Sequence, residues 1–172
     1  VYSAFQNGTA RSTATQSVKN QVDTWKNTVN SLSSEAEKVK MIHDLIVQKV
    51  NYNTDIYGNS FNEDTAYTQS VYSVFCMDKT VCAGYAQAFE MMCNGVGVDC
   101  IAVTSDDHEW NKVRINDSWY NVDCTWADQS TIDYEYFERS DAVYDADLAS
   151  YASSHAEESY WSEYLPACTL DS

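Results

Sequence analysis

The stretch VCAGYAQAFEMMCNGVG, residues 81–97, places Cys82 just ahead of an apolar repeat and Cys93 further along the same run. Apolar side chains recur at helical spacing from Tyr85 to Val96, so we predict a helix that begins at Cys82. The eleven steps from Cys82 to Cys93 would rise about 16 Å along a helix, whereas a disulfide needs Cα atoms within about 7 Å. The two cysteines therefore cannot pair if the helix forms.

A thiol in the first turn of a helix meets the positive end of the helix dipole and unpaired backbone N–H groups, which favour the thiolate. Cys82 is therefore a candidate nucleophile. The alternative is a small buried side chain, because free cysteine is among the most buried residue types. Thiolate catalysis also needs a base, and a third group that orients the base.

His108 and Asp123 are the candidates for these two roles, and both lie near a predicted hairpin. The runs 98–105, 108–115 and 118–126 have strand composition, and Asn116-Asp117 is turn chemistry for a tight hairpin. A two-residue turn pairs Ile115 with Ser118 and places His108 and Asp123 on one sheet face, with Cβ atoms about 7 Å apart. A three-residue turn would place them on opposite faces.

The remaining apolar patterns predict helices, which we place at 18–32, 34–51, 67–75 and 144–153. Helices followed by a small antiparallel sheet indicate an α+β fold, with the nucleophile-bearing helix packed on the sheet. We predict a single domain over 1–172, with 1–33 as an N-terminal helical extension and 34–172 as the catalytic core.

Composition narrows the classes of partner. The chain has 172 residues and a net charge of −16, which repels nucleic acid and anionic membrane surfaces. No run of about 18 apolar residues is present, so we expect no membrane insertion. The six cysteines contain no CxxC pair, and the acidic run at 141–147 lacks the glycine and final glutamate of an EF-hand loop. We therefore expect no metal and no cofactor, and leave the oligomeric state open.

Three motifs in order resemble the transglutaminase-like superfamily, in its bacterial form, whose cysteine enzymes have a papain-like core. They are CAGY at 82–85, HEWN at 108–111 and WYNVDCTW at 119–126. The resemblance extends over roughly 36–168. One departure is that SDDHEW lacks the glycine that many relatives carry shortly before the histidine.

The resemblance implies a cysteine peptidase, amidase or acyltransferase that works through a thioester on Cys82. His108 would accept and return the proton, and Asp123 would orient the His108 imidazole. The acyl donor would be a peptide, isopeptide or glutamine side chain in a protein, peptide or cell-wall peptide substrate. Water as acceptor gives hydrolysis and an amine gives cross-linking. The alternative is a catalytically silent binding or scaffold module at the cell surface. The acidic, lysine-poor composition favours a secreted or cell-surface location.

The oxyanion of such a reaction needs two donors. The backbone N–H of Cys82 is one, and Gln69 and Tyr72 are candidates for the second.

Trp110, Trp126 and Tyr85 are candidates for the walls of a substrate groove, although aromatic side chains on strands are more often core. We expect His155, in the polar stretch SSHAEES, to lie at the surface.

Overall fold

The computed structural model of the chain describes residues 2–54, 65–146 and 154–172. The helices are α1 (Gly8–Val29), α2 (Glu35–Lys49), α3 (Val71–Cys76), α4 (Cys82–Gly95), α5 (Cys124–Ala127), α6 (Asp141–Ala146) and α7 (Ser159–Ser162), with 3-10 turns η1 (Ser3–Phe5) and η3 (Ala66–Gln69). The strands are β1 (Asn51–Tyr52), β2 (Lys79–Thr80), β3 (Cys100–Thr104), β4 (Glu109–Ile115), β5 (Ser118–Val122) and β6 (Phe137–Arg139). The α+β prediction is confirmed.

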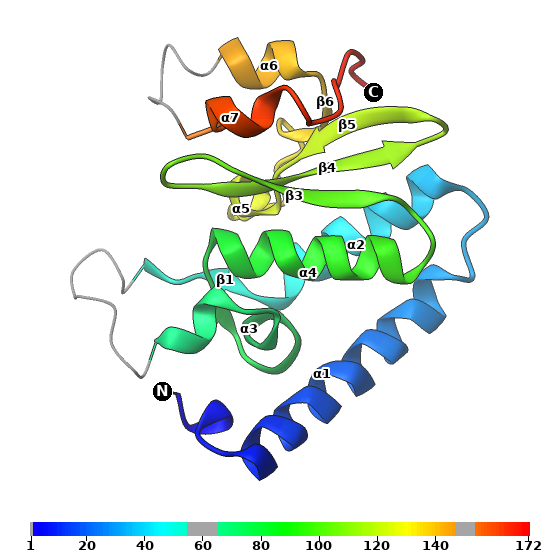
Figure 1. The fold of residues 1–172 in the computed structure, drawn as a ribbon. Helices are drawn as coiled ribbons and strands as arrows, with labels where there is room; N and C mark the ends of the chain where they lie inside the picture. Colours follow the sequence, from blue (N-terminus) through cyan, green and yellow to red (C-terminus); the bar gives the residue numbers. More distant parts are fainter. Residues whose placement is uncertain (1, 55–64, 147–153) are drawn as a thin grey trace.

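The antiparallel sheet, in the order β3-β4-β5-β6, is the middle layer of the fold. Helices α1 to α4 lie on one side of it, and α6 and α7 lie on the other (Figure 1). Helix α4 packs directly on β3 and β4, as predicted for the helix that carries Cys82. The short parallel pair β1-β2 leads into α4.

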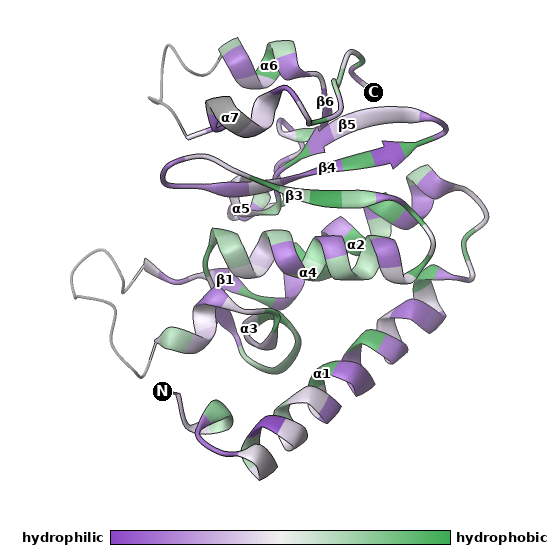
Figure 2. Ribbon diagram, in the orientation of Figure 1, coloured by the Kyte–Doolittle hydropathy of each residue, from purple (hydrophilic) through white to green (hydrophobic). Residues whose placement is uncertain are grey.

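Strand β4 is largely buried on both faces, and its buried residues include the polar Asn111 and Lys112. Val113 and Ile115 enter the main core with α4, whereas Trp110 enters a second cluster with Val103 and Tyr144 on the opposite face. Hydrophobic residues also fill much of β3 and alternate with polar ones along α1 (Figure 2). The sheet therefore separates two apolar cores.

The N-terminal helices are well defined by local signals. Ser34 and Glu37 form a reciprocal capping box at the start of α2, which confirms the predicted helix start. Helix α1 contributes Trp25 and Val29 to the main core. None of the helices in the described part of the chain is long and apolar enough to cross a membrane.

The β4–β5 hairpin has the predicted register. Ile115 pairs with Ser118, and Asn116 and Asp117 both have positive φ, at 48° and 69°. This is the backbone of a two-residue hairpin turn whose twist matches the strands. The register on which the approach of His108 to Asp123 depends is therefore confirmed.

Several predicted boundaries are wrong. The helix expected over 18–32 runs from Gly8 to Val29, and the helix expected over 67–75 is divided into η3 and α3. The strand expected over 118–126 ends at Val122, because the Asp123 carboxylate accepts the N–H groups of Thr125 (2.8 Å) and Trp126 (3.2 Å) and starts α5. The helix expected near 144–153 begins earlier, at Asp141, and 147–153 lie outside the described residues.

Candidate active site

Cys82 is the first residue of α4, as predicted. Its N-cap residue, Val81, makes no side-chain cap, so no side chain of Val81 competes for the N–H groups of the first turn. Cys82 is partly exposed while Cys93, on the same helix, is buried, and all six cysteines are free thiols. As the first residue of a helix, Cys82 has an N–H without an intrahelical partner, as an oxyanion donor requires.

A polar knot behind Cys82 fixes the start of α4. The hydroxyls of Ser73 and Thr80 are 2.5 Å apart; that of Ser73 donates to the Ser70 carbonyl over 2.7 Å, and that of Thr80 lies 3.2 Å from the Thr68 carbonyl. Gly84 lies against this knot: a Cβ there would collide with the Thr80 hydroxyl and come within 2.9 Å of the Thr68 carbonyl. The glycine of CAGY therefore allows α4 to approach the preceding segment.

His108 and Asp123 meet as the register predicts. His108 Nε2 lies 2.6 Å from Asp123 Oδ2, and the two side chains are 7% and 0% exposed. Burial lowers the pKa of His108, but the charge and hydrogen bond of Asp123, with further contributions from Cys82, outweigh it and raise the pKa to about 10. The imidazole is therefore held in its protonated form over the neutral range.

Cys82 lies near enough to His108 to be among the causes of its raised pKa. Because Asp123 engages Nε2, Nδ1 is the ring nitrogen that remains for the Cys82 thiol. The three side chains come from the start of α4, the start of β4 and the start of α5. The structure thus brings together the residues predicted as nucleophile, base and orienting group.

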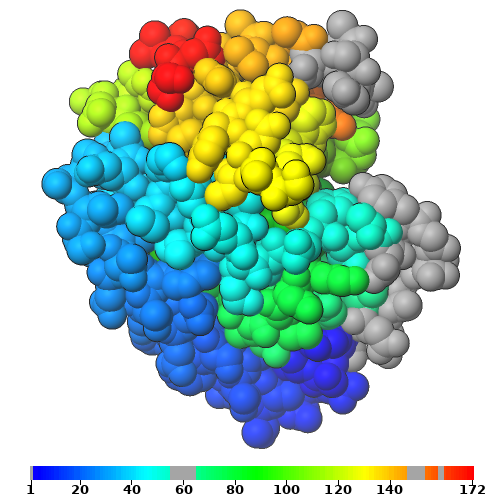
Figure 3. Space-filling model, turned by 180° about the vertical axis from the view of Figure 1, so that it is seen from behind, coloured from blue at the N-terminus to red at the C-terminus, as the bar shows by residue number. Residues whose placement is uncertain are grey.

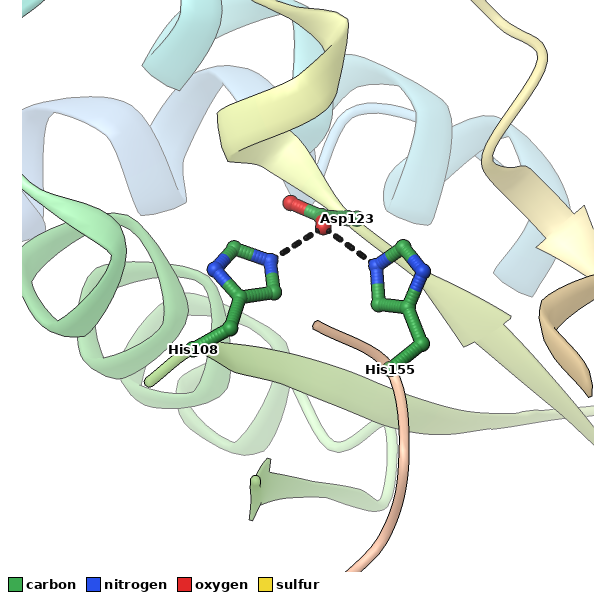
Figure 4. Close-up of side chains that lie close together, drawn as sticks. All are labelled: His108, Asp123 and His155. Atoms are coloured by element: carbon green, nitrogen blue, oxygen red, sulfur yellow. Dashed lines mark hydrogen bonds and ion pairs between the residues drawn. The ribbon is translucent and has the colours of Figure 1, made fainter. Parts of the chain in front are cut away.

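A second histidine, which no sequence pattern predicts, completes the cluster. His155 Nε2 lies 2.9 Å from the same Asp123 Oδ2, so the carboxylate sits between two imidazole rings (Figure 4). The prediction that His155 is a surface residue is wrong, since its side chain is 1% exposed. Its segment is held in place by Ser105 Oγ, which donates to the Ser154 carbonyl over 2.7 Å. Nothing in the local sequence signals this long-range contact.

The cluster of His108, Asp123 and His155 has ligand atoms within 4.8 Å of one another, close enough to hold a metal ion. Coordination through both Nε2 atoms would move the ring hydrogens to Nδ1. The Nδ1 of His155 is buried with no partner among the described residues, so a hydrogen there would be unsatisfied. In the structure the Asp123 carboxylate is instead engaged by both rings and by the N–H groups of Thr125 and Trp126.

A cleft of about 770 Å³ opens beside His108. It lies where the segment around Tyr52 meets the segment from Thr125 to Tyr136, which appear side by side in cyan and yellow in Figure 3. The N–H of Tyr52 joins the two by donating to Asp128 over 2.8 Å. The cleft is lined by four carboxylates, those of Asp107, Asp128, Asp133 and Glu135. Its described lining contains no lysine or arginine.

Of the three aromatic groove candidates, Trp126 lines this cleft. Tyr85 and Trp110 are not among the residues that line it, and each is only 1% exposed. The Tyr85 hydroxyl donates to Asp128 over 2.6 Å and the Trp110 indole donates to Asn121 over 3.2 Å. Both belong to the core, where their polar atoms are satisfied.

The two oxyanion candidates lie in different surroundings. Tyr72 packs against the rings of Phe5 and Tyr2 and lines hollows formed with α1, away from the cleft beside His108. Gln69 is exposed at the end of η3, whose Thr68 carbonyl accepts the N–H of Val81. Gln69 thus stays a prediction for the second oxyanion donor. The position of Tyr72 argues against Tyr72 in that role.

Comparison with known proteins gives a family match. A family model described as transglutaminase-like superfamily matches residues 23–124, which include all three of Cys82, His108 and Asp123. The kyphoscoliosis peptidases of Mus musculus and Homo sapiens are each 29% identical over 110 residues, covering 55% of this chain and 16% of those proteins. This chain therefore spans about one sixth of the length of these curated relatives.

A solved structure described as "Crystal structure of a TGase" has a similar fold, with a TM-score of 0.58. The match covers 73% of this chain and 35% of that one, at 16% identity. At this identity the likeness concerns the fold, and it agrees with the predicted arrangement of a helix packed on a small antiparallel sheet.

Proposed function

The chain belongs to the transglutaminase-like superfamily, and from this membership we propose that it hydrolyses or transfers the acyl group of an amide through a thioester on Cys82. The observation that carries the proposal is the 2.6 Å bond between His108 and Asp123, next to a cysteine at a helix start. This arrangement supplies a nucleophile, a proton carrier and an orienting carboxylate.

In the acylation step, the Cys82 sulfur attacks the carbonyl carbon of the amide. The carbonyl oxygen becomes an oxyanion, which the backbone N–H of Cys82 stabilises at the start of α4. His108, which its raised pKa keeps protonated, gives a proton to the leaving nitrogen as the C–N bond breaks. The products are a thioester on Cys82, a free amine and a neutral His108.

In the deacylation step, neutral His108 takes a proton from the acceptor as it attacks the thioester carbon. The C–S bond then breaks and the thiolate returns beside the imidazolium. Water as acceptor releases a carboxylic acid, whereas an amine forms a new amide. Asp123 stays ionised throughout and orients the ring.

The acidic cleft supports a substrate with positive charge beside the reacting amide. Its carboxylates attract a lysine side chain or a free amine, and Trp126 and Tyr136 add aromatic surface for the hydrocarbon part. We therefore propose a peptide or cell-wall peptide that carries an amine close to the amide that reacts.

The experiment is to incubate the protein with glutamine peptides, isopeptides and cell-wall peptides and search for Cys82 acyl adducts by mass spectrometry. Each peptide is offered with lysine or glutamate flanks. The proposal expects adducts on the wild-type protein, preferentially from lysine-flanked peptides, and none on Cys82→Ala. Absence of any adduct or turnover across the library would contradict it.

A silent binding module is the second candidate, and the low exposure of the His108 side chain, 7%, is the observation that favours it. In that case a peptide would bind in the cleft equally well to the wild-type protein and to Cys82→Ala. No thioester would form on either.

A further inference from the structure

We propose that His155 is a positioning residue, which acts through Asp123 to hold His108 in the orientation and tautomer that proton exchange with Cys82 requires. The inference rests on the proposed function of Cys82. It starts from one carboxylate oxygen: Asp123 Oδ2 is 2.6 Å from His108 Nε2 and 2.9 Å from His155 Nε2 (Figure 4).

The two short contacts fix where the hydrogens lie. An ionised carboxylate only accepts hydrogen bonds, so each ring must carry a hydrogen on Nε2. For His108 this leaves Nδ1 as the nitrogen that gives and takes the proton of Cys82. For His155 the other ring nitrogen, Nδ1, is buried without a partner among the described residues.

Packing alone does not account for a histidine at this position. The His155 ring is surrounded by aromatic side chains, with centroids at 4.3 Å for Tyr144, 4.6 Å for Trp126, 5.3 Å for Trp110 and 5.4 Å for Tyr136. A phenylalanine would fill the same space without burying an unpaired ring nitrogen, which costs stability. What histidine supplies here, and phenylalanine cannot, is the Nε2–H that donates to Asp123.

With His155 in place, every acceptor position of Asp123 has a donor. Oδ1 takes the N–H groups of Thr125 and Trp126, and Oδ2 takes the two rings. Burial raises the pKa of Asp123, but the charge and hydrogen bond of His108, followed by those of His155, lower it far below its ordinary value. The carboxylate is thus held as an anion in one orientation, and His108 keeps its Nε2–H.

The Ser105 hydroxyl links the segments of the two histidines a second time, through their backbone groups. Ser105 Oγ accepts the N–H of His108 over 3.1 Å and donates to the carbonyl of Ser154 over 2.7 Å. A serine beside β3 therefore sets the start of the His108 strand and the segment that delivers His155. The His155 ring is held at a fixed distance from the catalytic pair, as a positioning role demands.

The test compares His155→Phe, which keeps the aromatic shape and loses the donor, with His155→Gln, whose side-chain N–H₂ occupies the place of Nε2. Tyr144→Phe is the matched control, because it keeps the ring beside His155 and both contacts to Asp123 Oδ2, and removes only the hydrogen bond from the Tyr144 hydroxyl to the Tyr136 carbonyl. We expect His155→Phe to lower both kcat and the rate of Cys82 alkylation by iodoacetamide at pH 6 by roughly tenfold or more, with KM unchanged. His155→Gln should recover most of the loss, and Tyr144→Phe should behave as the wild type.

A folded His155→Phe protein with wild-type rates would overturn the inference, and so would equal losses in His155→Phe and His155→Gln. If the variants do not fold, nitrogen NMR of the wild-type imidazoles decides: hydrogen on Nε2 of His155 supports the role and hydrogen on Nδ1 alone overturns it. If no peptide acylates wild-type Cys82, the proposed function fails, while the alkylation rates still decide the role of His155.

Discussion

His108 Nε2 and Asp123 Oδ2 are 2.6 Å apart across the open end of the β4–β5 hairpin, beyond the last paired residues. The two-residue turn sets the face on which both side chains lie. The cap that Asp123 places on α5 then holds its carboxylate still, because Oδ1 is bound to two backbone N–H groups. One residue thus ends a strand, starts a helix and orients the histidine that we propose as the catalytic base.

Asp123→Asn should preserve the fold and remove most of the activity. Asparagine is as good an N-cap as aspartate, so α5 keeps its start. Its amide, however, offers His108 no anion and favours the wrong tautomer, and we expect kcat to fall by about 10⁴-fold. Steady-state kinetics with circular dichroism as the folding control checks this. Retention of more than a tenth of the wild-type kcat would refute the orienting role.

The raised pKa of His108 makes its contribution to stability depend on pH. Its ordinary value is 6.5 and the folded value is about 10, so its stabilising effect is complete below 6.5 and is lost as pH rises through 10. The difference in unfolding free energy between the wild type and His108→Gln should therefore shrink from pH 6 to pH 10. Urea titrations of both proteins measure it, and a difference that does not change with pH would contradict the ion-pair account.

Gly84→Ala should destabilise the protein by about 1–3 kcal/mol, because the new methyl group collides with the Thr80 hydroxyl in a buried knot. Gly95→Ala is the matched control on the same helix. Its Cβ would meet only the Lys26 side chain at ordinary contact distance, so it should stabilise by roughly 0.5 kcal/mol. Urea midpoints that move in the same direction for both variants would show that the knot is not rigid.

Lys112 ties the C-terminal segment to the sheet, although it is 2% exposed. Its ammonium group binds Glu157 (2.6 Å), Asp141 (3.0 Å) and the Pro166 carbonyl (3.0 Å). Lys112→Met should cost about 2 kcal/mol or more, because two half-buried carboxylates lose their counter-charge. Lys19→Met breaks an exposed pair with Asp23 and should cost less than about 0.5 kcal/mol. If thermal unfolding showed a larger loss of stability in Lys19→Met than in Lys112→Met, it would contradict the role of Lys112 in holding the C-terminal segment to the sheet.

Sequence patterns predicted the parts of the site that local chemistry decides. An apolar stripe behind Cys82 set the helix start, and Asn116-Asp117 set the hairpin register and hence the side of His108. The end of β5 also has a local signal, since aspartate is a common N-cap, but the strand composition of 118–126 predicts a strand that continues past it. Asp123 serves as that cap.

The aromatic groove candidates and His155 show what sequence patterns could not supply. Strand alternation places Trp110 on a definite face of β4, but whether that face is open depends on the C-terminal segment that covers it. His155 reaches Asp123 only through contacts between residues 32 positions apart, which no periodicity in SSHAEES encodes. Such positions are set by tertiary packing.

Competitive alkylation of the native protein tests the central claim most directly. Cys76 is the internal control, since it is partly exposed like Cys82, but burial raises its pKa and no histidine activates it. The four remaining cysteines are buried. With limiting iodoacetamide at pH 6 and peptide mass spectrometry, we predict that Cys82 reacts at least about tenfold faster than Cys76, and that His108→Gln abolishes the difference. Equal labelling of Cys82 and Cys76 in the folded wild-type protein would contradict a nucleophile activated by His108.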